Sequence, residues 1–535
     1  MKPFSRLFKV YGSAVLLSSI VLVMSCTDNF DEINTNKNAL SQLGTGELPF
    51  LFSKAQSTAT NNGWNYQIAQ NLFHDQYCQY FANTTTYFPS DRLVIRFDWI
   101  RAAWNPIYSE VLPQLQTLLS ETDGYADGTA ENAIAKIWWV YTFHRLTDTW
   151  GPVPYTAAGV PNETGGIAYD DQESIYNDLF EKLDEAVTTL NGKTGETPYG
   201  SFDLIYGGNV DKWIRFANTL RLRMAIRVSG VEPGLATTQA NAALAGNKLM
   251  ENNSHDALIT RTLKGDDFNG LTVMDWNEFR MSATMESVLK GYDDPRMAVY
   301  FSEAADGGYH GLRNGLTSAD MANAKNKANF NSNKGPRWDK SKPGTMETAS
   351  NVMAAAEAWF LKAEAEIILG IDVPGFTAEQ LYNKGIEVSM NQWGISDAGA
   401  IAAYQASNAT PIAPDDDKQS PAVSSAPVAF RSSGSTSEKL EQITIQKWLA
   451  LFPEGVEAWA DIRRSRQFKL YPVAQSDNPD LPNPADRNAP SNNWIRRIPF
   501  IADEKQTNAA EVEKAVNLLG GPDKITTPLW WDAND

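Results

Sequence analysis

Apolar residues recur at helical spacing along most of the chain. One run places them at steps of four, four, three and four residues, at Ile175, Leu179, Leu183, Ala186 and Leu190. This spacing puts all five side chains on one face of a helix. Asp170 or Asp171 can cap the start of that helix, and Gly192 can end it.

Other segments show the same periodicity. Three further stripes predict helices within 134–145, 213–224 and 353–367, and Gly370 stands where the last of these would stop. Additional helices are expected at about 46–60, 65–82, 98–120, 235–248, 377–392 and 436–452. Alternating strand patterns are few and short. The sequence therefore predicts a mainly α protein, rather than an all-β or a parallel α/β fold.

Several predicted helices are neighbours joined by short turns. The clearest pair is 351–369 and 377–392, where Ala and Gly fall at close crossings and large aromatic residues lie between them. This pair is similar to a tetratricopeptide hairpin, although the strict repeat signature is absent. We expect a tetratricopeptide-like scaffold of stacked helix pairs.

Three long irregular excursions interrupt the helical pattern. Residues 251–345 are rich in Asn, Gly and Asp, and residues 403–437 are rich in Ser, Ala and Pro. Residues 472–493 contain five prolines, which exclude a regular helix. Loops this long in a folded protein are usually functional or disordered. We expect these excursions to form the ligand face.

The N-terminus has the features of a bacterial export signal. Lys2, Arg6 and Lys9 precede an apolar run over 10–24, and Cys26 follows Ser25. The run is short for a membrane span, although a single N-terminal anchor helix is an alternative. The apolar-apolar-Ser-Cys sequence resembles a lipobox, which implies that Cys26 carries lipid. We therefore predict a signal peptide over 1–25, a leash over 26–45 and a single domain over 46–535.

Charge and cysteine content restrict the possible partners. The chain carries a net charge of −18, and loss of the three positive charges in the signal peptide takes this to −21. Such a balance argues against nucleic-acid binding, which relies on Lys and Arg. Only two cysteines occur. If Cys26 is lipidated, Cys78 has no disulfide partner, and its aromatic surroundings predict a buried apolar side chain.

No motif for a metal, a cofactor or catalysis is present. The four histidines lack zinc-site spacing, and no phosphate loop, nucleophile elbow or calcium loop occurs. His144 is interpreted as a core histidine bonded to a neighbour, and Asp415-Asp416-Asp417 as a solvated run. We predict no metal and no cofactor. The 64 acidic residues leave a surface glycoside hydrolase as a remote alternative, since sequence cannot give the separation of two carboxylates.

Short motifs in a fixed order resemble the SusD/RagB family of nutrient-binding outer-membrane lipoproteins. They are Asp31-x-x-Asn34-x-Asn36, Gly151-x-x-Pro154-Tyr155, Trp213-x-x-Phe216-Ala217-Asn218, Asp294-Pro295-Arg296, the helix pair around Trp448 and Trp459, and the ending Leu529-Trp530-Trp531-Asp532. They cover the chain from Cys26 almost to its end. Lys37 departs from the family pattern, in which proline is expected. By themselves these motifs are structural, and Asp461, Arg463 and Arg464 are expected to form ion pairs between late helices.

The resemblance implies a function as well as a fold. It implies a surface-exposed lipoprotein, without enzyme activity, that captures oligosaccharides for import by a SusC-like TonB-dependent transporter. The membrane contact would be the lipid on Cys26, and the protein would face the cell exterior. Binding of peptides or another nutrient by the same architecture is the main alternative.

Aromatic residues in loops are the candidates for stacking on sugar rings, with nearby polar groups for the hydroxyls. The resemblance points to the segment after an early helix and to the middle excursion. The candidate ligand residues are Trp64, Asn83, Tyr87, Asp91, Arg92, Trp99, Trp276, Tyr292, Tyr309 and Trp338. Trp104 is expected to pack between helices instead.

Overall fold

Helices make up most of the computed structural model, as the periodicity predicts. The structure describes residues 46–123, 129–273, 278–481 and 494–532. Its α-helices are α3 (Leu48–Ala59), α4 (Phe97–Pro106), α5 (Leu112–Glu121), α6 (Ala130–Trp150), α7 (Gln172–Asn191), α8 (Val210–Val228), α9 (Pro233–Leu244), α10 (Gly270–Val273), α11 (Ala283–Gly291), α12 (Met297–Tyr300), α13 (Ala355–Leu369), α14 (Ala378–Gln392), α15 (Ala398–Gln405), α16 (Thr436–Leu451), α17 (Gly455–Ser465), α18 (Ala502–Thr507) and α19 (Ala509–Leu518).

Strands are short in the described part of the chain. They form two antiparallel pairs, β1 (Phe81–Asn83) with β3 (Phe279–Met281), and β2 (Ala257–Ile259) with β4 (Ser350–Met353). Two helical segments have π geometry, η1 (Gln67–Asp75) and η3 (Ile107–Val111). The predicted helix at 65–82 is therefore shorter than expected, because the chain enters β1 at its end.

Local sequence signals account for the ends of the helices. Asp171 caps α7 by accepting a hydrogen bond from the amide of Ser174, and Gly192 ends it. Gly370 closes α13 with φ +65°, a conformation that glycine adopts without strain. The expected start of α13 at Met353 is wrong, because Met353 pairs with Ala257 in the β2–β4 ladder and the helix begins only at Ala355.

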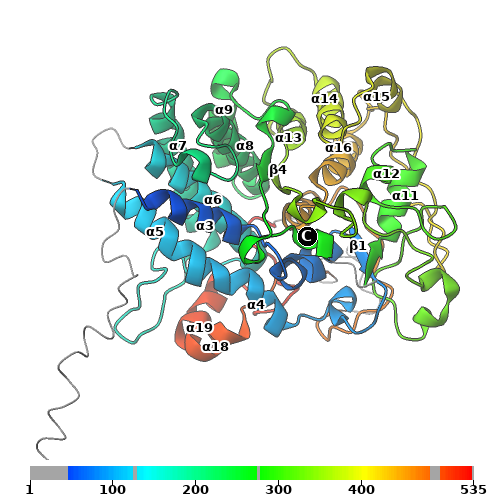
Figure 1. Ribbon diagram of the computed structural model, residues 1–535, viewed down its shortest axis with the longest axis horizontal. Helices are drawn as coiled ribbons and strands as arrows, with labels where there is room; N and C mark the ends of the chain where they lie inside the picture. The colour runs from blue at the N-terminus through cyan, green and yellow to red at the C-terminus, as the bar shows by residue number, and fades with distance from the viewer. Residues whose placement is uncertain (1–45, 124–128, 274–277, 482–493, 533–535) are drawn as a thin grey trace, which may run out of the picture. The chain divides into compact units, whose positions relative to one another are not determined.

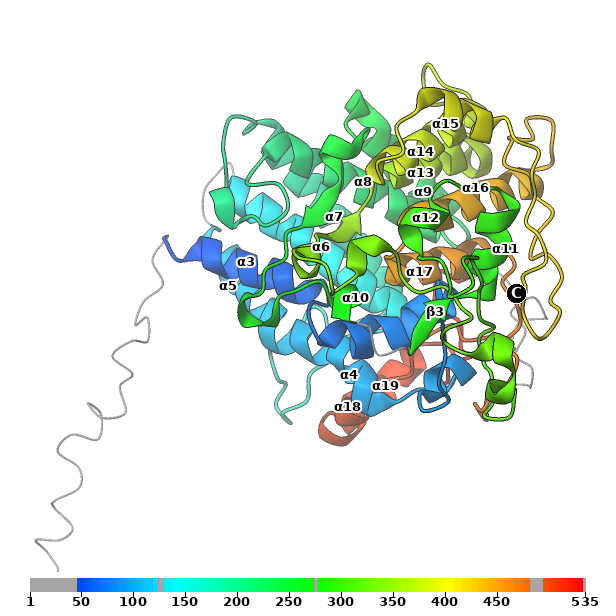
Figure 2. The same ribbon diagram turned by 45° about the vertical axis from the view of Figure 1, so that its right-hand side comes forward.

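Consecutive helices pack side by side and form a continuous scaffold. The pairs α6/α7, α8/α9 and α13/α14 are in close contact, and α8 also touches α13, which touches α16. Figure 1 follows this series from α7 through α13 to α16, and Figure 2 shows it turned. Large aromatic side chains fill the space between the helices, among them Trp138, Trp213, Trp448 and Trp459, all buried.

The N-terminal predictions fall on residues 1–45, which lie outside the described residues, so Cys26 and the leash have no structural account. Residues Pro49–Asp535 form one compact unit. Among the described residues, no helix combines the length and apolarity needed to cross a bilayer. Cys78 is buried as predicted, and its thiol donates to the carbonyl of Asp75 at 3.5 Å.

Two arginines of α8 connect three other helices through buried carboxylates. Arg223 donates two hydrogen bonds, of 2.7 and 2.6 Å, to Glu357 of α13. Arg227 lies 2.5 Å from Glu457 of α17 and 3.2 Å from Asp148 of α6. All five side chains are at most 6% exposed. Buried charges are tolerated only when they are paired in this way.

A second buried network connects α13, α16 and α17. Lys447 of α16 contacts both Glu364 and Asp461 at 2.8 Å, and Arg464 contacts the same two carboxylates. Burial would raise the pKa of Asp461, but the adjacent Lys447 and Arg464 charges hold it well below its usual range. The ion pairs predicted for Asp461 and Arg464 are therefore confirmed. Arg463 differs, because it donates to three backbone carbonyls and its guanidinium stacks on Trp459 at 3.5 Å.

Replacing Arg227 with leucine is expected to destabilise the protein by about 3–5 kcal/mol, because Asp148 and Glu457 would remain buried without their cation. Urea unfolding of the purified variants measures this change. Lys384→Ala is the matched control, since it removes a cation from an exposed pair with Glu387 and should change stability by less than about 1 kcal/mol. Equal effects of the two substitutions would contradict the role given to the network.

His144 makes stability depend on pH. Burial, together with the charges of Arg227, Arg223 and Arg145, lowers its pKa to about 3, although Asp148 opposes the shift. A histidine held neutral in the fold stabilises it above the unfolded pKa of about 6.5, and this contribution declines as the pH falls. The stability advantage of the wild type over His144→Gln should therefore shrink by about 2 kcal/mol between about pH 8 and pH 5.

This comparison needs the variant, because other groups titrate in the same range. Burial raises the pKa of Asp75 to about 7, so Asp75 stabilises the fold at low pH and its contribution declines as the pH rises. Subtracting the His144→Gln curve removes such shared contributions. A difference in unfolding free energy that stays constant with pH would rule out a neutral buried His144.

Candidate functional site

Two aromatic rings lie together on the surface between β1 and α4. Tyr87 is 72% exposed, and Trp99, in the first turn of α4, is half-buried. Their ring centroids are 6.4 Å apart and their planes are inclined by 39°. We call this pair the Tyr87–Trp99 platform. A broad aromatic surface beside solvent is suited to stacking on an apolar face of a ligand.

Buried aromatic packing fixes the platform from below. Phe88 contacts both Tyr87 and Trp99, with centroid separations of 5.1 and 5.7 Å, and stacks on Phe279 of β3. The guanidinium of Arg96 lies 4.4 Å from the Trp99 ring centre and pairs with Asp98 through two hydrogen bonds. Arg96 thus places a cation over one face of the Trp99 ring, with N–H donors that Asp98 does not use.

Asn83, Asp91 and Arg92, three of the predicted ligand residues, hold in place the loop that carries Tyr87. They do not form a shared exposed surface. Asn83 is buried and exchanges hydrogen bonds with Gln76. Asp91 is buried and accepts hydrogen bonds from the Asn314 side chain at 2.8 Å and the Gly315 amide at 2.9 Å. Burial raises the pKa of Asp91 to about 6, despite these bonds.

Arg92 is also committed to protein contacts. Its Nε donates to Asp477 at 2.6 Å, and Nη2 donates to the carbonyl of Thr86 at 3.2 Å. Only 12% of its side chain is exposed. Asn83, Asp91 and Arg92 therefore position the segment that carries Tyr87, and we leave them out of the proposed contact surface.

A second exposed ring, Trp64, lies in the turn between α3 and η1. It is 52% exposed, and its ring meets Phe268 edge-on at 5.2 Å. Gly63 has φ +54°, and a Cβ there would approach the carbonyl oxygen of Asp266 to 2.0 Å. Only glycine fits this close approach. Asn61 also has a positive φ, of +47°, which is uncommon for a residue with a side chain.

A cavity of about 250 Å³ opens beside Trp64. Its lining comes from α3, the Trp64 turn, α4, η3 and the 265–266 turn; the residues are Lys54, Thr58, Asn61, Asn62, Trp64, Asn65, Ala102, Pro106, Glu110, Gly265 and Asp266. Lys54 and Glu110 pair across it at 2.5 Å. We call this space the Trp64 cavity. Amide, hydroxyl and carboxylate groups around one aromatic ring form a polar binding surface.

The other predicted rings lie elsewhere. Tyr292 and Trp338 are each 2% exposed, Tyr292 against Tyr404 and Trp338 between Trp393 and Phe452. Neither has a free face for a ligand, so we omit both from the proposed surface. Tyr309 is half-buried, and no described ring contact joins it to Tyr87. Trp276 lies outside the described residues. Trp104 packs between helices as expected, edge-on to Trp150 at 5.2 Å.

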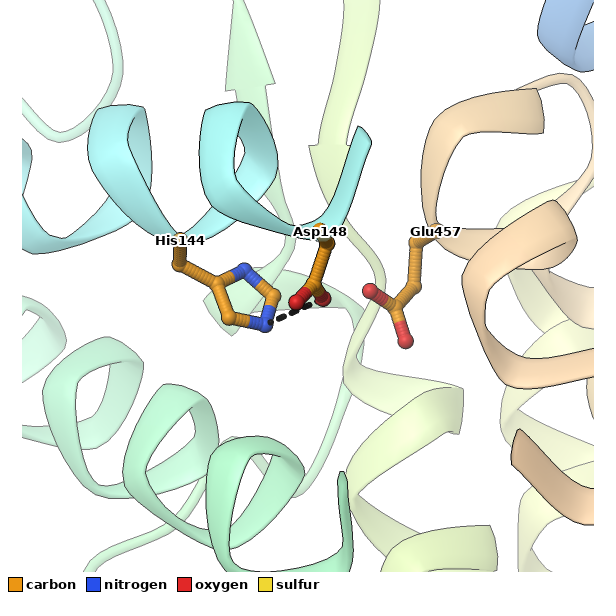
Figure 3. Close-up of side chains that lie close together, drawn as sticks. All are labelled: His144, Asp148 and Glu457. Carbon is orange, nitrogen blue, oxygen red and sulfur yellow. Dashed lines mark ion pairs between the residues drawn. The ribbon is translucent and has the colours of Figure 1, made fainter. Parts of the chain in front are cut away.

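One buried cluster among the described residues has ligand atoms close enough for a metal, at His144, Asp148 and Glu457 (Figure 3). His144 is buried in the core as predicted, and its Nε2 lies 3.3 Å from Asp148, but neither ring nitrogen makes the predicted hydrogen bond to a neighbour. Arg227 contacts both carboxylates. The cation of this cluster is therefore the arginine side chain, and we interpret the group as a structural ion-pair network.

The run Asp415-Asp416-Asp417 is not simply solvated, contrary to the prediction. Asp416 is 5% exposed and accepts a hydrogen bond from the amide of Ser420 at 3.0 Å. Asp415 pairs with Lys325 instead. Asp416 thus stabilises the loop, and Asp415 pairs with a different neighbour.

Sequence reasoning did not identify most of the polar lining of the Trp64 cavity. The Asn61-Asn62-Gly63 run is a turn signal and could have drawn attention to the residues beside Trp64. Lys54 and Asp266 carry no such signal, because they reach the cavity from segments far apart in the chain.

Comparison with known proteins identifies the fold family. Residues 28–532 match the SusD-like family, described as Susd and RagB outer membrane lipoprotein. A search of curated proteins gives no match. Among solved structures, a chitin-binding SusD homolog from Flavobacterium johnsoniae is 32% identical, with a TM-score of 0.80, covering 91% of this chain and 98% of that one.

Two other solved structures agree. A SusD homolog from Bacteroides vulgatus is 30% identical, with a TM-score of 0.80, covering 91% of this chain and 97% of that one. A SusD homolog from Bacteroides uniformis is 30% identical, with a TM-score of 0.79, covering 91% of this chain and 99% of that one. The chain belongs to the SusD-like family of outer-membrane lipoproteins.

Proposed function

We propose that this protein is a surface-exposed glycan-binding lipoprotein that captures oligosaccharides for a SusC-like TonB-dependent transporter. The observation that carries the proposal is the exposed Tyr87–Trp99 platform, on a fold shared with a relative described as chitin-binding. The apolar faces of sugar rings stack on such surfaces, and Arg96, over the Trp99 ring, can donate hydrogen bonds to hydroxyl oxygens.

The arrangement favours binding on a preformed surface. Phe88 and Phe279 support the platform rigidly, so a ligand meets a preformed surface and little ordering is required. Asn83, Asp91 and Arg92 fix the backbone on both sides of Tyr87. Held in this way, the loop functions as a static binding surface. Transfer to the transporter would follow release of the ligand.

Calorimetric titration of the mature protein against oligosaccharides and peptides tests the proposal. Saturable binding of an oligosaccharide, with no products by mass spectrometry, is the expected result. Binding of peptides alone would favour the alternative ligand class. Formation of products would contradict a pure capture function.

Tyr87→Ala is expected to weaken oligosaccharide binding by about 10- to 30-fold, because an exposed stacking ring contributes roughly 1.4–2 kcal/mol. Calorimetry measures the change, with the oligosaccharide that binds the wild-type protein in the titration. Phe376→Ala is the control, since it removes an exposed aromatic ring just before α14, away from the platform. If Tyr87→Ala binds as tightly as Phe376→Ala, the platform is not the contact surface.

The lipid anchor has its own test. Mass spectrometry of the wild-type protein from membranes should find Cys26 as the first residue with attached acyl chains, and Cys26→Ala should lack the lipid. The substitution removes the residue that would carry the acyl chains, and with them the basis of membrane attachment. Stable anchoring takes more than one acyl chain. Retention of residues 1–25 by the wild type would instead support an N-terminal anchor helix.

A further inference from the structure

The Trp64 cavity has polar groups that the fold does not use. Within the described residues, the side chains of Thr58, Asn61, Asn65 and Asp266 line this space without a hydrogen bond to another protein group. The neighbouring Asn62 differs, because its amide donates to Asp267 at 2.7 Å and to Ser57 at 2.9 Å. The cavity therefore offers two amides, a hydroxyl and a carboxylate for hydrogen bonds to a bound molecule.

The turn that carries Trp64 is held in a defined shape. Asp267 accepts hydrogen bonds from Ser57, Asn62 and Arg261, and the Gly63 amide donates to the carbonyl of Phe268 at 2.9 Å. Asn61, in the same turn, has a positive φ. Sparsely populated backbone conformations persist only where surrounding contacts impose them, and they cluster at ligand sites. The hydrogen bonds of the turn therefore fix the shape of this side of the cavity.

Helix α4 connects the cavity with the Tyr87–Trp99 platform. Trp99, Ala102 and Pro106 are three and four residues apart, so they lie on one face of α4. Ala102 and Pro106 line the cavity, and Trp99 belongs to the platform. The helical rise separates Trp99 from Pro106 by about 10 Å along this face.

A polar contact also lies between the two aromatic sites. Gln67, three residues after Trp64, donates to Glu278 at 3.0 Å. The carbonyl of Glu278 accepts from the amide of Thr84, three residues before Tyr87, at 2.8 Å. The two rings are therefore carried by segments that are fastened to each other. Their separation is fixed by the fold, as two subsites of one extended ligand require.

We propose that the Trp64 cavity is a second carbohydrate subsite, and that one oligosaccharide chain extends along α4 from the Tyr87–Trp99 platform to Trp64. The inference rests on the proposed glycan-binding function and adds a length requirement. Lys54 and Glu110 pair with each other at the cavity, so the unused groups are the two amides, the hydroxyl and the Asp266 carboxylate, which suit the hydroxyl and amide groups of a sugar. Occupying a second linked subsite raises affinity without any new contact at the first.

The test uses the mature protein and N-acetylglucosamine oligomers from the disaccharide upward, titrated by calorimetry. Wild-type affinity should rise at the length that reaches both subsites. Trp64→Ala should remove this rise, weakening the long oligomers by about tenfold or more while leaving the shortest one unchanged. Tyr87→Ala should weaken every length.

Asn65→Ala provides a second variant in the same cavity. Asn65 is exposed, so its truncation leaves the core intact, and it should weaken only the long oligomers. Phe376→Ala should match the wild type at all lengths. Thermal melting of each variant confirms that the proteins compared are folded.

The outcomes separate the two proposals. If Tyr87→Ala weakens binding and Trp64→Ala and Asn65→Ala change nothing at any length, the second subsite is overturned and the glycan-binding function stands. If Trp64→Ala weakens the shortest oligomer as much as the longest, the cavity is the primary site and the extended arrangement is overturned. If the wild type binds no oligomer of the series or of other glycans, both proposals fail.

Discussion

The ion pairs between Arg227 and the carboxylates of Asp148 and Glu457 hold together elements on which the remaining structure depends. Asp148 also accepts hydrogen bonds from Tyr176 of α7 and from Trp531 near the C-terminus. One carboxylate therefore connects α6, α7, α8 and the end of the chain. In a low-dielectric interior such bonds are strong, and leaving one partner alone is costly, so the helices that carry them have a defined arrangement.

This arrangement explains how the loops can be held in fixed positions on the helical scaffold. The packed helices fix the points at which the loops begin and end. Strand pairing and buried hydrogen bonds then hold the loops themselves. The β1–β3 pairing and the buried Asp91 fix the segment that carries Tyr87. A buried polar residue that satisfies distant backbone groups can position a loop as firmly as an apolar core does. A ligand that stacks on exposed rings of such loops, as we propose, would bind with little loss of conformational freedom in the protein.

The candidate site was only partly predictable. Tyr87, Trp99 and Trp64 are exposed or half-buried rings at places that the sequence indicated. Tyr292 and Trp338 look the same in sequence, yet both are buried, because the irregular excursions around them fold back against α15, α16 and their neighbours. An aromatic residue in a loop can pack or be exposed, and local composition does not separate the two.

The sequence by itself determined the helical elements, their caps, the motif order and the predicted export signal, because these depend on residues close together in the chain. The stripe of α7, with Asp171 and Gly192 at its ends, is such a case. Only the tertiary structure decided the roles of Asp91, Arg92 and Asp416, and which groups surround Trp64. Lys54, Glu110 and Asp266 meet at one cavity through long-range packing of α3, η3 and a distant turn. The spacing of residues along the chain does not predict such contacts, because the burial of apolar surface and the pairing of buried charges determine them.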